Sequence, residues 1–357
     1  MDKIYGVIRN ISPLNKQALI KAQMRLDNLT KPIGSLGRLE EVAKKVAGVT
    51  GKIDLSFSRK VIFVFAADHG VAEEGVSAYP QEVTCQMVYN FLRGGAGINV
   101  LARHIGAEVV VVDIGVAKDL SLKPQPNFKV KKVGYGTKNM AKEKAMSKNE
   151  SIRSVEMGIE VFEKEHKKNP IDIVGLGDMG IANTTASSAI LACITGKDPE
   201  EVTGRGTGIN DKIWERKVEV VRRSLRIHLP DPHDALDVLA KVGGYEIGGI
   251  AGCILAAAKN KVPVVIDGFI STAGALIATG LAPEVRNYLF ASHLSLEKGH
   301  RIALDYLRLS PLLNLNLRLG EGTGAALAIS IIEAGVKILT QMATFEEAGV
   351  SREIGCV

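Results

Sequence analysis

Five short apolar runs constrain the fold of this chain more than any other feature. They are rich in Val and Ile, continuous rather than alternating, and bounded by small or polar residues, as is typical of strands buried on both faces. Helical patterns lie between them, for example over 186–195, 214–228, 234–241 and 249–259. This alternation predicts an α/β fold with a mostly parallel sheet flanked by helices. The runs span 61–65, 109–115, 171–177, 262–267 and, with a weaker pattern, 287–292.

The two ends of the chain carry helical patterns and no convincing strand, as over 12–26 and 323–343. We therefore predict a smaller helical domain built from residues 1–50 plus 318–357, and an α/β domain over 51–317. The segment 117–140 contains Pro124, Pro126 and two glycines and is predicted to be a long loop.

The charge balance argues against a nucleic-acid partner. The 45 Lys and Arg against 39 Asp and Glu give a net charge of +6, and only 5% of the 357 residues are aromatic. A nucleic-acid binder concentrates basic residues on one face and adds stacking aromatics. The excess positive charge suits a small anionic substrate better.

The cysteines and apolar segments indicate a cytoplasmic protein without a membrane partner. Cys85, Cys193, Cys253 and Cys356 form no CxxC and no Cys/His zinc spacing, so we expect reduced thiols and no metal site. The N-terminus lacks the apolar core of a signal peptide. The most apolar late stretch, 325–343, is interrupted by Glu333 and Lys337.

Acidic, hydroxyl and glycine residues follow the predicted strands. Examples are the segments beginning at Asp68, Asp113, Asp178, Asp267 and Ser292. Because ligands of open parallel sheets bind beyond the carboxyl ends of the strands, we predict a site along this edge.

The segment GLGDMG at 175–180 matches the dinucleotide fingerprint G-x-G-x-x-G. The fingerprint also needs an acid closing a second strand about 20 residues later, and Glu200 and Glu201 do not close one. A narrower interpretation survives, in which a helix starting near Asn183 and Thr184 binds a phosphate at its N-terminus. The alternative is plain capping by these side chains.

Two further glycine clusters precede helices. Gly204–Gly208 comes before a helix with Lys212, Arg216 and Lys217, one of which could reach a phosphate if it is not on a solvated face. In RLGEGTG at 318–324, Glu321 lies between glycines before an apolar helix. A partly desolvated carboxylate there would suit general-base catalysis, whereas the alternative is a first-turn acid favoured by the helix dipole.

Three histidines, His69, His293 and His300, are weaker candidates. No nucleophile stands at a triad-like spacing from His69, and the other two are expected at the surface or as caps.

The motifs taken together resemble those of the nicotinate-nucleotide–dimethylbenzimidazole phosphoribosyltransferase family. The resemblance runs from LDNLTKPIGSLGRLE at 26–40 and AADHGVAEEGVSAYPQEVT at 66–84 through GDMGIANTTASSA, GRGTGI, GGYEIGGIAG, DGFISTAGAL, SHLSLEKG and RLGEGTGAALA. It implies a Rossmann-like domain with a small helical domain, a homodimer, and no cofactor. It also implies transfer of ribose phosphate from nicotinate mononucleotide to 5,6-dimethylbenzimidazole.

The resemblance also implies site residues. The catalytic glutamate of the RLGEG motif corresponds to Glu321, and Asp178 stands where the family's GEMG motif has a glutamate one methylene longer. TKPIG at 30–34 replaces the family's TKPPG, with Ile33 for a proline. Two alternatives stay open, a nicotinamide-dinucleotide-dependent oxidoreductase and a non-catalytic nucleotide-binding protein. The implied substrate contacts are Gly177, Gly180, Asn183, Thr184, Lys217, Asp267, Gly268, Ser295, Leu319 and Gly320, with Tyr79, Gln86 and Met87 less securely placed.

Overall fold

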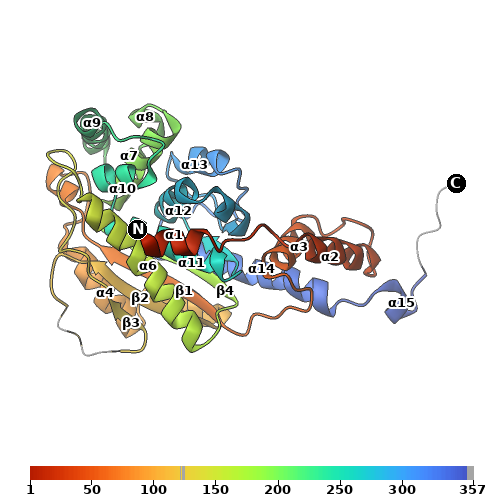
Figure 1. Ribbon diagram of the computed structural model, residues 1–357. Helices are drawn as coiled ribbons and strands as arrows, with labels where there is room; N and C mark the ends of the chain where they lie inside the picture. The colour runs from red at the N-terminus through yellow and green to blue at the C-terminus, as the bar shows by residue number, and fades with distance from the viewer. Residues whose placement is uncertain (121, 123–124, 352–357) are drawn as a thin grey trace.

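The fold is built on a parallel sheet (Figure 1). The computed structural model describes residues 1–120, 122 and 125–351, and within them the sheet has six strands in the order β3-β2-β1-β4-β5-β6. Every neighbouring pair is parallel. The chain therefore reverses its direction of progress between β1 and β4, as in Rossmann-like sheets. The predicted fold class is confirmed. The strands are β1 Lys60–Ala67, β2 Ala107–Gly115, β3 Phe128–Val130, β4 Ile173–Met179, β5 Val264–Ile266 and β6 Leu289–Ala291.

The five predicted apolar runs all form strands, but the prediction of a loop over 117–140 is incomplete. Strand β3 lies inside that segment and pairs with Val111–Asp113 of β2 at the edge of the sheet. Three residues on an edge strand are too few to produce a continuous apolar run. Pro124 lies outside the described residues.

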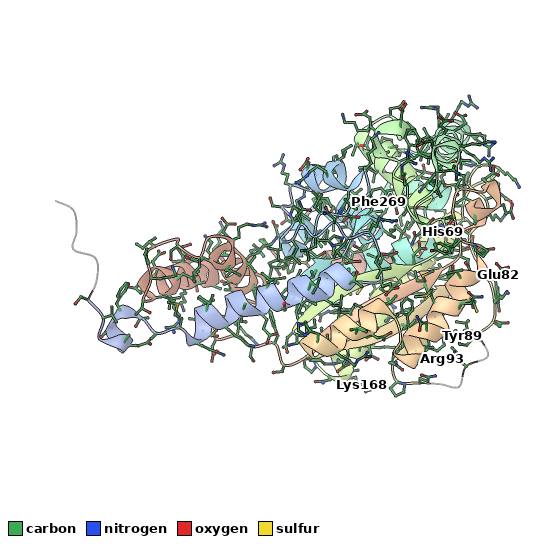
Figure 2. The ribbon with its side chains drawn as sticks, turned by 180° about the vertical axis from the view of Figure 1, so that it is seen from behind. His69, Glu82, Tyr89, Arg93, Lys168 and Phe269 are labelled. Atoms are coloured by element: carbon green, nitrogen blue, oxygen red, sulfur yellow. The ribbon has the colours of Figure 1, made fainter. Side chains whose placement is uncertain are left out.

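Alternate side chains of β1 enter two separate cores. Phe63 and Phe65 pack on the face covered by α6 (Lys148–Lys168) and α11 (Tyr245–Lys259). Ile62 and Val64 pack on the opposite face, against α4 (Glu82–Arg93), α5 (Gly97–Ile105) and α14 (Thr323–Gln341). Figure 1 shows α6 in front of the sheet, and the reverse view in Figure 2 brings α4, α5 and α14 forward.

The remaining helices of the α/β part gather at one end of the molecule, at the top of Figure 1. Helix α7 directly follows β4, and α12 directly follows β5, so both begin at the carboxyl edge of the sheet. These elements are α7 Asn183–Thr195, α8 Pro199–Val202, α9 Asp211–His228, α10 Ala235–Val242, α12 Phe269–Leu281 and α13 His300–Tyr306, with 3₁₀ helices η1 Gly70–Glu74 and η2 Pro283–Tyr288.

A helical lobe projects from the sheet (Figure 1). It contains α2 (Lys16–Asn28), α3 (Arg38–Thr50), the distal part of α14 and α15 (Phe345–Ala348). Helix α1 (Asp2–Ile8) instead contacts α6 and α11, and α14 contacts both β4 and α3. The division into 1–50 plus 318–357 and 51–317 therefore stays a prediction.

Helix α14 is, among the described residues, the one helix long and apolar enough to cross a membrane by length and composition alone. More than half of its apolar window is buried inside the protein. It packs against α3, α5 and the sheet, which is the environment of a core helix.

Helices α6 and α11 approach each other closely through glycines. A Cβ on Gly252 would overlap the Val155 carbonyl oxygen, and one on Gly158 would overlap that of Gly249. We predict that Gly252→Ala lowers the free energy of unfolding by about 1–3 kcal/mol, because backbone atoms cannot yield to the added methyl. Thermal and urea unfolding would measure the change.

Gly6 provides a matched control, since it also lies within a helix but has open space at its Cβ position. We expect Gly6→Ala to be neutral or to stabilise the protein by up to about 1 kcal/mol. Equal destabilisation by both substitutions would contradict the packing argument.

Candidate active site

A cavity of about 520 Å³ lies at the carboxyl edge of the sheet. Its size is within the range of small-molecule sites. It is lined by the turn after β4, the segments after β5 and β6, and three loops at 76–79, 206–207 and 316–320. Figure 2 shows His69 and Phe269, which follow β1 and β5, at the end of the sheet opposite Lys168.

The structure brings most of the predicted site residues together, but not all. The cavity is lined by Tyr79, Asp178, Gly180, Asn183, Thr184, Gly268, Ser295, Leu319 and Gly320. The predicted residues outside its lining are Gly177, Gln86, Met87, Lys217, Asp267 and Glu321. A second cavity of about 450 Å³, lined among others by Phe57, His166 and Asp172, lies at the amino edge and contains none of them.

The turn after β4 presents an open helix N-terminus to the cavity. Residues 175–179 belong to β4 itself, so this GxGxxG match is not the loop of a dinucleotide site. The chain turns at Gly180 and enters α7 through Ala182, which has a φ of +73°. No side chain caps α7. The Asn183 side-chain amide instead donates from Nδ2 to Asp178 Oδ2 at 2.9 Å. The alternative of plain capping by these side chains is therefore wrong. The Asn183 and Thr185 backbone amides already donate to the Gly180 and Ala182 carbonyls, so the Thr184 amide and the helix dipole are what this N-terminus offers to an anion.

Lys217 is the cation that reaches this N-terminus. Lys212 and Arg216 are exposed, whereas Lys217 is buried and its Nζ donates to Thr184 Oγ1 at 2.7 Å. Burial lowers the pKa of Lys217 to about 8, and the nearby Glu297 carboxylate opposes the shift. Glu297 Oε1 in turn accepts a hydrogen bond from the Gly206 amide at 2.8 Å. Glu297 also lines the cavity and is a site residue that no sequence motif predicted.

Asp178 lies at the end of β4 between the turn that leads into α7 and the Gly320 backbone. Its side chain is buried, and its Oδ1 has no hydrogen-bond partner among the described residues. Burial raises the pKa of Asp178 well above its usual range, and the carboxylates of Asp267 and Glu246 add to the shift. These influences favour the protonated form of the carboxyl group, which can donate a hydrogen bond.

Glu321 lies on a left-handed turn that glycine permits on both sides. Its φ is +63°, and those of Gly320 and Gly322 are +81° and +93°. The carboxylate is buried, and Oε2 accepts a hydrogen bond from the Ile98 amide, in the first turn of α5, at 3.1 Å. Burial raises the pKa of Glu321, and the bond from Ile98 opposes this. Glu321 thus precedes α14 and is not a first-turn acid of that helix.

The prediction that His293 and His300 lie at the surface or act as caps is wrong. Both are buried beneath the loop that follows β6, and burial lowers the pKa of His300 to about 3. His300 Nδ1 accepts from the Ser295 amide at 2.9 Å, so its proton is on Nε2, which lies 3.0 Å from Thr272 Oγ1. Thr272 donates to the Gly268 carbonyl at 2.8 Å.

This chain of bonds joins two cavity-lining residues, Gly268 and Ser295, through His300. No sequence pattern predicts this chain of bonds, since Thr272 and His300 are 28 positions apart in the sequence. His69 has a similar unpredicted partner. Its Nε2 lies 2.6 Å from Glu246 Oε1 of α11, and both side chains are buried.

The strand order reverses between β1 and β4, and the cavity lies at that edge beside Lys217 and the uncapped N-terminus of α7. These features define the class of α/β enzymes that bind a phosphorylated small molecule. The chain belongs to the nicotinate-nucleotide–dimethylbenzimidazole phosphoribosyltransferase family. A family model described as phosphoribosyltransferase matches residues 11–350.

Relatives of that name match over almost the whole chain. The enzyme of Geotalea uraniireducens (strain Rf4) is 57% identical over 351 residues, covering 98% of this chain and 99% of the relative. That of Desulforudis audaxviator (strain MP104C) is 56% identical over 352 residues, covering 99% of each. The crystal structure of CobT from Thermus thermophilus is 47% identical and superposes with a TM-score of 0.90, covering 94% of this chain and all of that one.

The Lys217 ammonium leads to a pH prediction. Its pKa of about 8 in the free protein means that the group loses its charge as the pH rises through 8. We predict that affinity for nicotinate mononucleotide falls by about twofold between pH 7 and 8 and then by up to about tenfold per pH unit. Calorimetric titration between pH 7 and 9.5 would measure this.

Lys217→Met provides the comparison, since it removes the titrating group. The variant should bind weakly at every pH and lack the alkaline decline. A decline of the same steepness in Lys217→Met would show that another group causes it.

Proposed function

We propose that this chain transfers ribose 5-phosphate from nicotinate mononucleotide to 5,6-dimethylbenzimidazole, giving α-ribazole 5′-phosphate and nicotinate. The observation that carries the proposal is the full-length match to relatives named for this reaction. The cavity supports it, because the N-terminus of α7 and the buried carboxyl groups of Asp178 and Glu297 line a space of nucleotide size. The reaction belongs to synthesis of the cobalamin lower ligand.

The nucleotide phosphate binds at the N-terminus of α7. The backbone amide and hydroxyl of Thr184 provide donors there, and the Lys217 ammonium and the helix dipole provide positive charge. The ribose lies toward Gly268 and Ser295, which the His300 chain of bonds holds in place. The Asp178 carboxyl group, whose protonated form is favoured by burial and whose Oδ1 is unpaired among the described residues, donates a hydrogen bond to the ribose.

Glu321 acts as the general base. The C1′–N bond of the nicotinate nucleotide breaks, its electron pair stays on the nicotinate nitrogen, and the ribose gains oxocarbenium character. One benzimidazole nitrogen attacks C1′ from the opposite face, which converts the β-linkage into an α-linkage. The other nitrogen gives its proton to Glu321, whose raised pKa suits this role. No pyrophosphate leaves, so we expect turnover without added metal ion.

The base pocket that we propose is mainly aliphatic, with Tyr79 as an aromatic member. Leu319 and Tyr79 line the cavity with exposed side chains, and a Cβ on Gly97 would come within 3.0 Å of Leu319 Cδ2 and 3.3 Å of Glu321 Oε2. Leu319 therefore lies beside the Glu321 carboxylate. Gln86 and Met87 of α4 complete this pocket in our proposal.

We predict that the purified protein forms α-ribazole phosphate from the two substrates, and that Glu321→Gln lowers kcat by about a hundredfold or more while remaining folded. Mass spectrometry of products and circular dichroism would measure both. A panel of benzimidazoles, purines and phenols in the same assay defines the preferred base.

Glu333→Gln is the matched control. Glu333 lies on α14, which begins just after the Glu321 turn, but it pairs with Lys60 and Lys337 away from that turn. Its substitution should leave kcat unchanged. Full activity of Glu321→Gln would reject the assigned base.

Two other functions make different predictions. A dinucleotide-dependent oxidoreductase would bind a nicotinamide dinucleotide and reduce or oxidise a hydroxy-acid. A non-catalytic binding protein would bind nicotinate mononucleotide without releasing nicotinate when the base is added. Neither is favoured by a particular contact, and the position of 175–179 within β4 disfavours the first.

We also propose that the protein is a homodimer joined through the helical lobe. Ile20 and Met24 of α2 and Ile33 in the following loop expose 59, 61 and 73% of their surface. Such a group of exposed apolar side chains favours association with a second copy. Light scattering should give twice the 38.2 kDa chain mass, and Met24→Glu should shift the population toward the monomer. A monomeric wild-type protein at micromolar concentration would contradict this.

A cytoplasmic location is part of the proposal. Cys85, Cys193 and Cys253 are free thiols in the described residues, as expected in a reducing compartment. Cys356 lies outside the described residues.

A further inference from the structure

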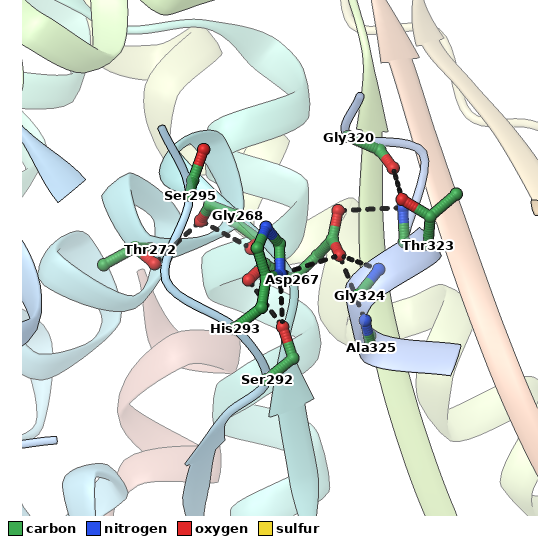
Figure 3. Close-up of polar contacts among 12 residues, drawn as sticks. Asp267, Gly268, Thr272, Ser292, His293, Ser295, Gly320, Thr323, Gly324 and Ala325 are labelled. Carbon is green, nitrogen blue, oxygen red and sulfur yellow. Dashed lines mark hydrogen bonds and ion pairs between the residues drawn. The ribbon is translucent and has the colours of Figure 1, made fainter. Parts of the chain in front are cut away.

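Asp267 lies at the end of β5 with both carboxylate oxygens turned toward the start of α14 (Figure 3). Oδ1 accepts from the amides of Gly324 at 2.6 Å and Ala325 at 3.0 Å, and Oδ2 accepts from that of Gly322 at 3.1 Å. The residue is buried and is not part of the cavity lining. Its oxygens are therefore directed at the protein backbone and not at a substrate.

Helix α14 needs these bonds because it cannot cap itself. Its N-cap is Gly322, which has no side chain. The first amides of a helix have no partner within the helix, and leaving them unpaired in a buried position is costly. Asp267 thus acts as an N-cap supplied by another element. Burial raises the pKa of Asp267 to about 7, and the three amide bonds oppose this rise. In its ionised form the carboxylate also interacts favourably with the positive end of the helix dipole.

One of the three bonds acts directly on the backbone of Glu321. The Gly322 amide that donates to Asp267 belongs to the peptide whose carbonyl is that of Glu321. A left-handed conformation costs a non-glycine residue roughly 1–2 kcal/mol, so the Glu321 turn needs such external contacts to persist. The same peptide packs against Gly177, where a Cβ would overlap the Glu321 carbonyl group and the Gly322 nitrogen.

The surroundings leave little freedom for a different arrangement. A Cβ on Gly324 would overlap His293 Nδ1 and would come within 2.9 Å of Asp267 Oδ1. His293 itself is held by Ser292 Oγ at 3.0 Å, which donates to the Asp267 carbonyl at 2.7 Å. The Asp267 carboxylate is therefore closely surrounded, and its three hydrogen bonds hold the turn and the start of α14.

We propose that Asp267 is a positioning residue for the Glu321 turn and does not contact the substrate. The inference rests on the proposed role of Glu321 as the base, and it replaces the expectation that Asp267 binds substrate. Without the carboxylate, the Gly320–Gly322 turn loses its fixed geometry and Glu321 moves away from the nitrogen that it deprotonates. The phosphate contacts lie on α7 and α9, and Ser295 follows β6. Gly268 directly follows Asp267, but its carbonyl is held by Thr272, which contacts His300, so the ribose contact keeps its place.

The first experiment separates chemistry from binding. Asp267→Asn keeps one oxygen for α14 but replaces the other with an amide that cannot accept from Gly322. We expect kcat to fall by about tenfold to a hundredfold while KM for nicotinate mononucleotide changes by less than about threefold. A rise in KM with unchanged kcat would mean that Asp267 binds substrate, and would overturn the proposal.

Asp234→Asn is the matched control. Asp234 caps α10 by accepting from the amides of Leu236 and Asp237, far from the cavity lining. The loss of this cap should leave kcat and KM unchanged. Circular dichroism and thermal unfolding establish that both variants are folded. If Asp267→Asn does not fold, Asp267→Ser, which keeps a hydroxyl acceptor, takes its place in every measurement.

A double-mutant cycle tests whether Asp267 acts through Glu321. In the Glu321→Gln background, where little base catalysis remains, Asp267→Asn should change kcat by less than about twofold, because groups that act as one unit are not additive. Additive losses would overturn the positioning role and leave the proposed function intact. Full activity of Glu321→Gln alone would reject the base and, with it, the role of Asp267.

Discussion

The contact between the Glu321–Gly322 peptide and the Cα of Gly177 fixes the position of the site. A Cβ at Gly177 would overlap the Glu321 carbonyl group, so the turn can lie on β4 only because that strand has no side chain there. The bonds from Asp267 then attach the same turn to the neighbouring strand β5. Glu321 is thereby placed near the ends of β4 and β5, which contribute to the cavity, and beside the N-terminus of α5.

The sequence predicts the sheet well because its strands are buried on both faces. Continuous Val and Ile runs mark β1, β2, β4 and β5, and a weaker apolar run marks β6. Parallel strands put their carboxyl ends at one edge, which locates the cavity. Strand β3 is missed because three residues on an edge leave no such run. The path of α14 from the sheet to the lobe is not visible in any local pattern, since it depends on which helices it contacts.

The sequence predicts the site only in part, because burial and contacts between distant residues select its members. Its position after a strand identifies Asp178, and a glycine cluster before an apolar helix identifies Glu321. The family resemblance supplies their roles. Burial, which the sequence does not contain, selects Lys217 from three cations on α9. The partners of His300, Asp267 and His69 are distant in the chain, and the sequence analysis named neither Glu246 nor Glu297 as a site residue. A hydrogen bond between distant segments has no signature in a single sequence.

Helix α14 connects the helical lobe to the site as one rigid element. Its 19 residues span about 28 Å, from the end next to Glu321 to the region packed on α3. Near that far end, a Cβ on Gly335 would come within 2.8 Å of the Leu39 carbonyl oxygen, so helix and lobe fit closely. A helix transmits a displacement along its axis with little loss. The lobe therefore cannot shift along α14 without moving the Glu321 turn, and any contact that steadies the lobe also steadies the base.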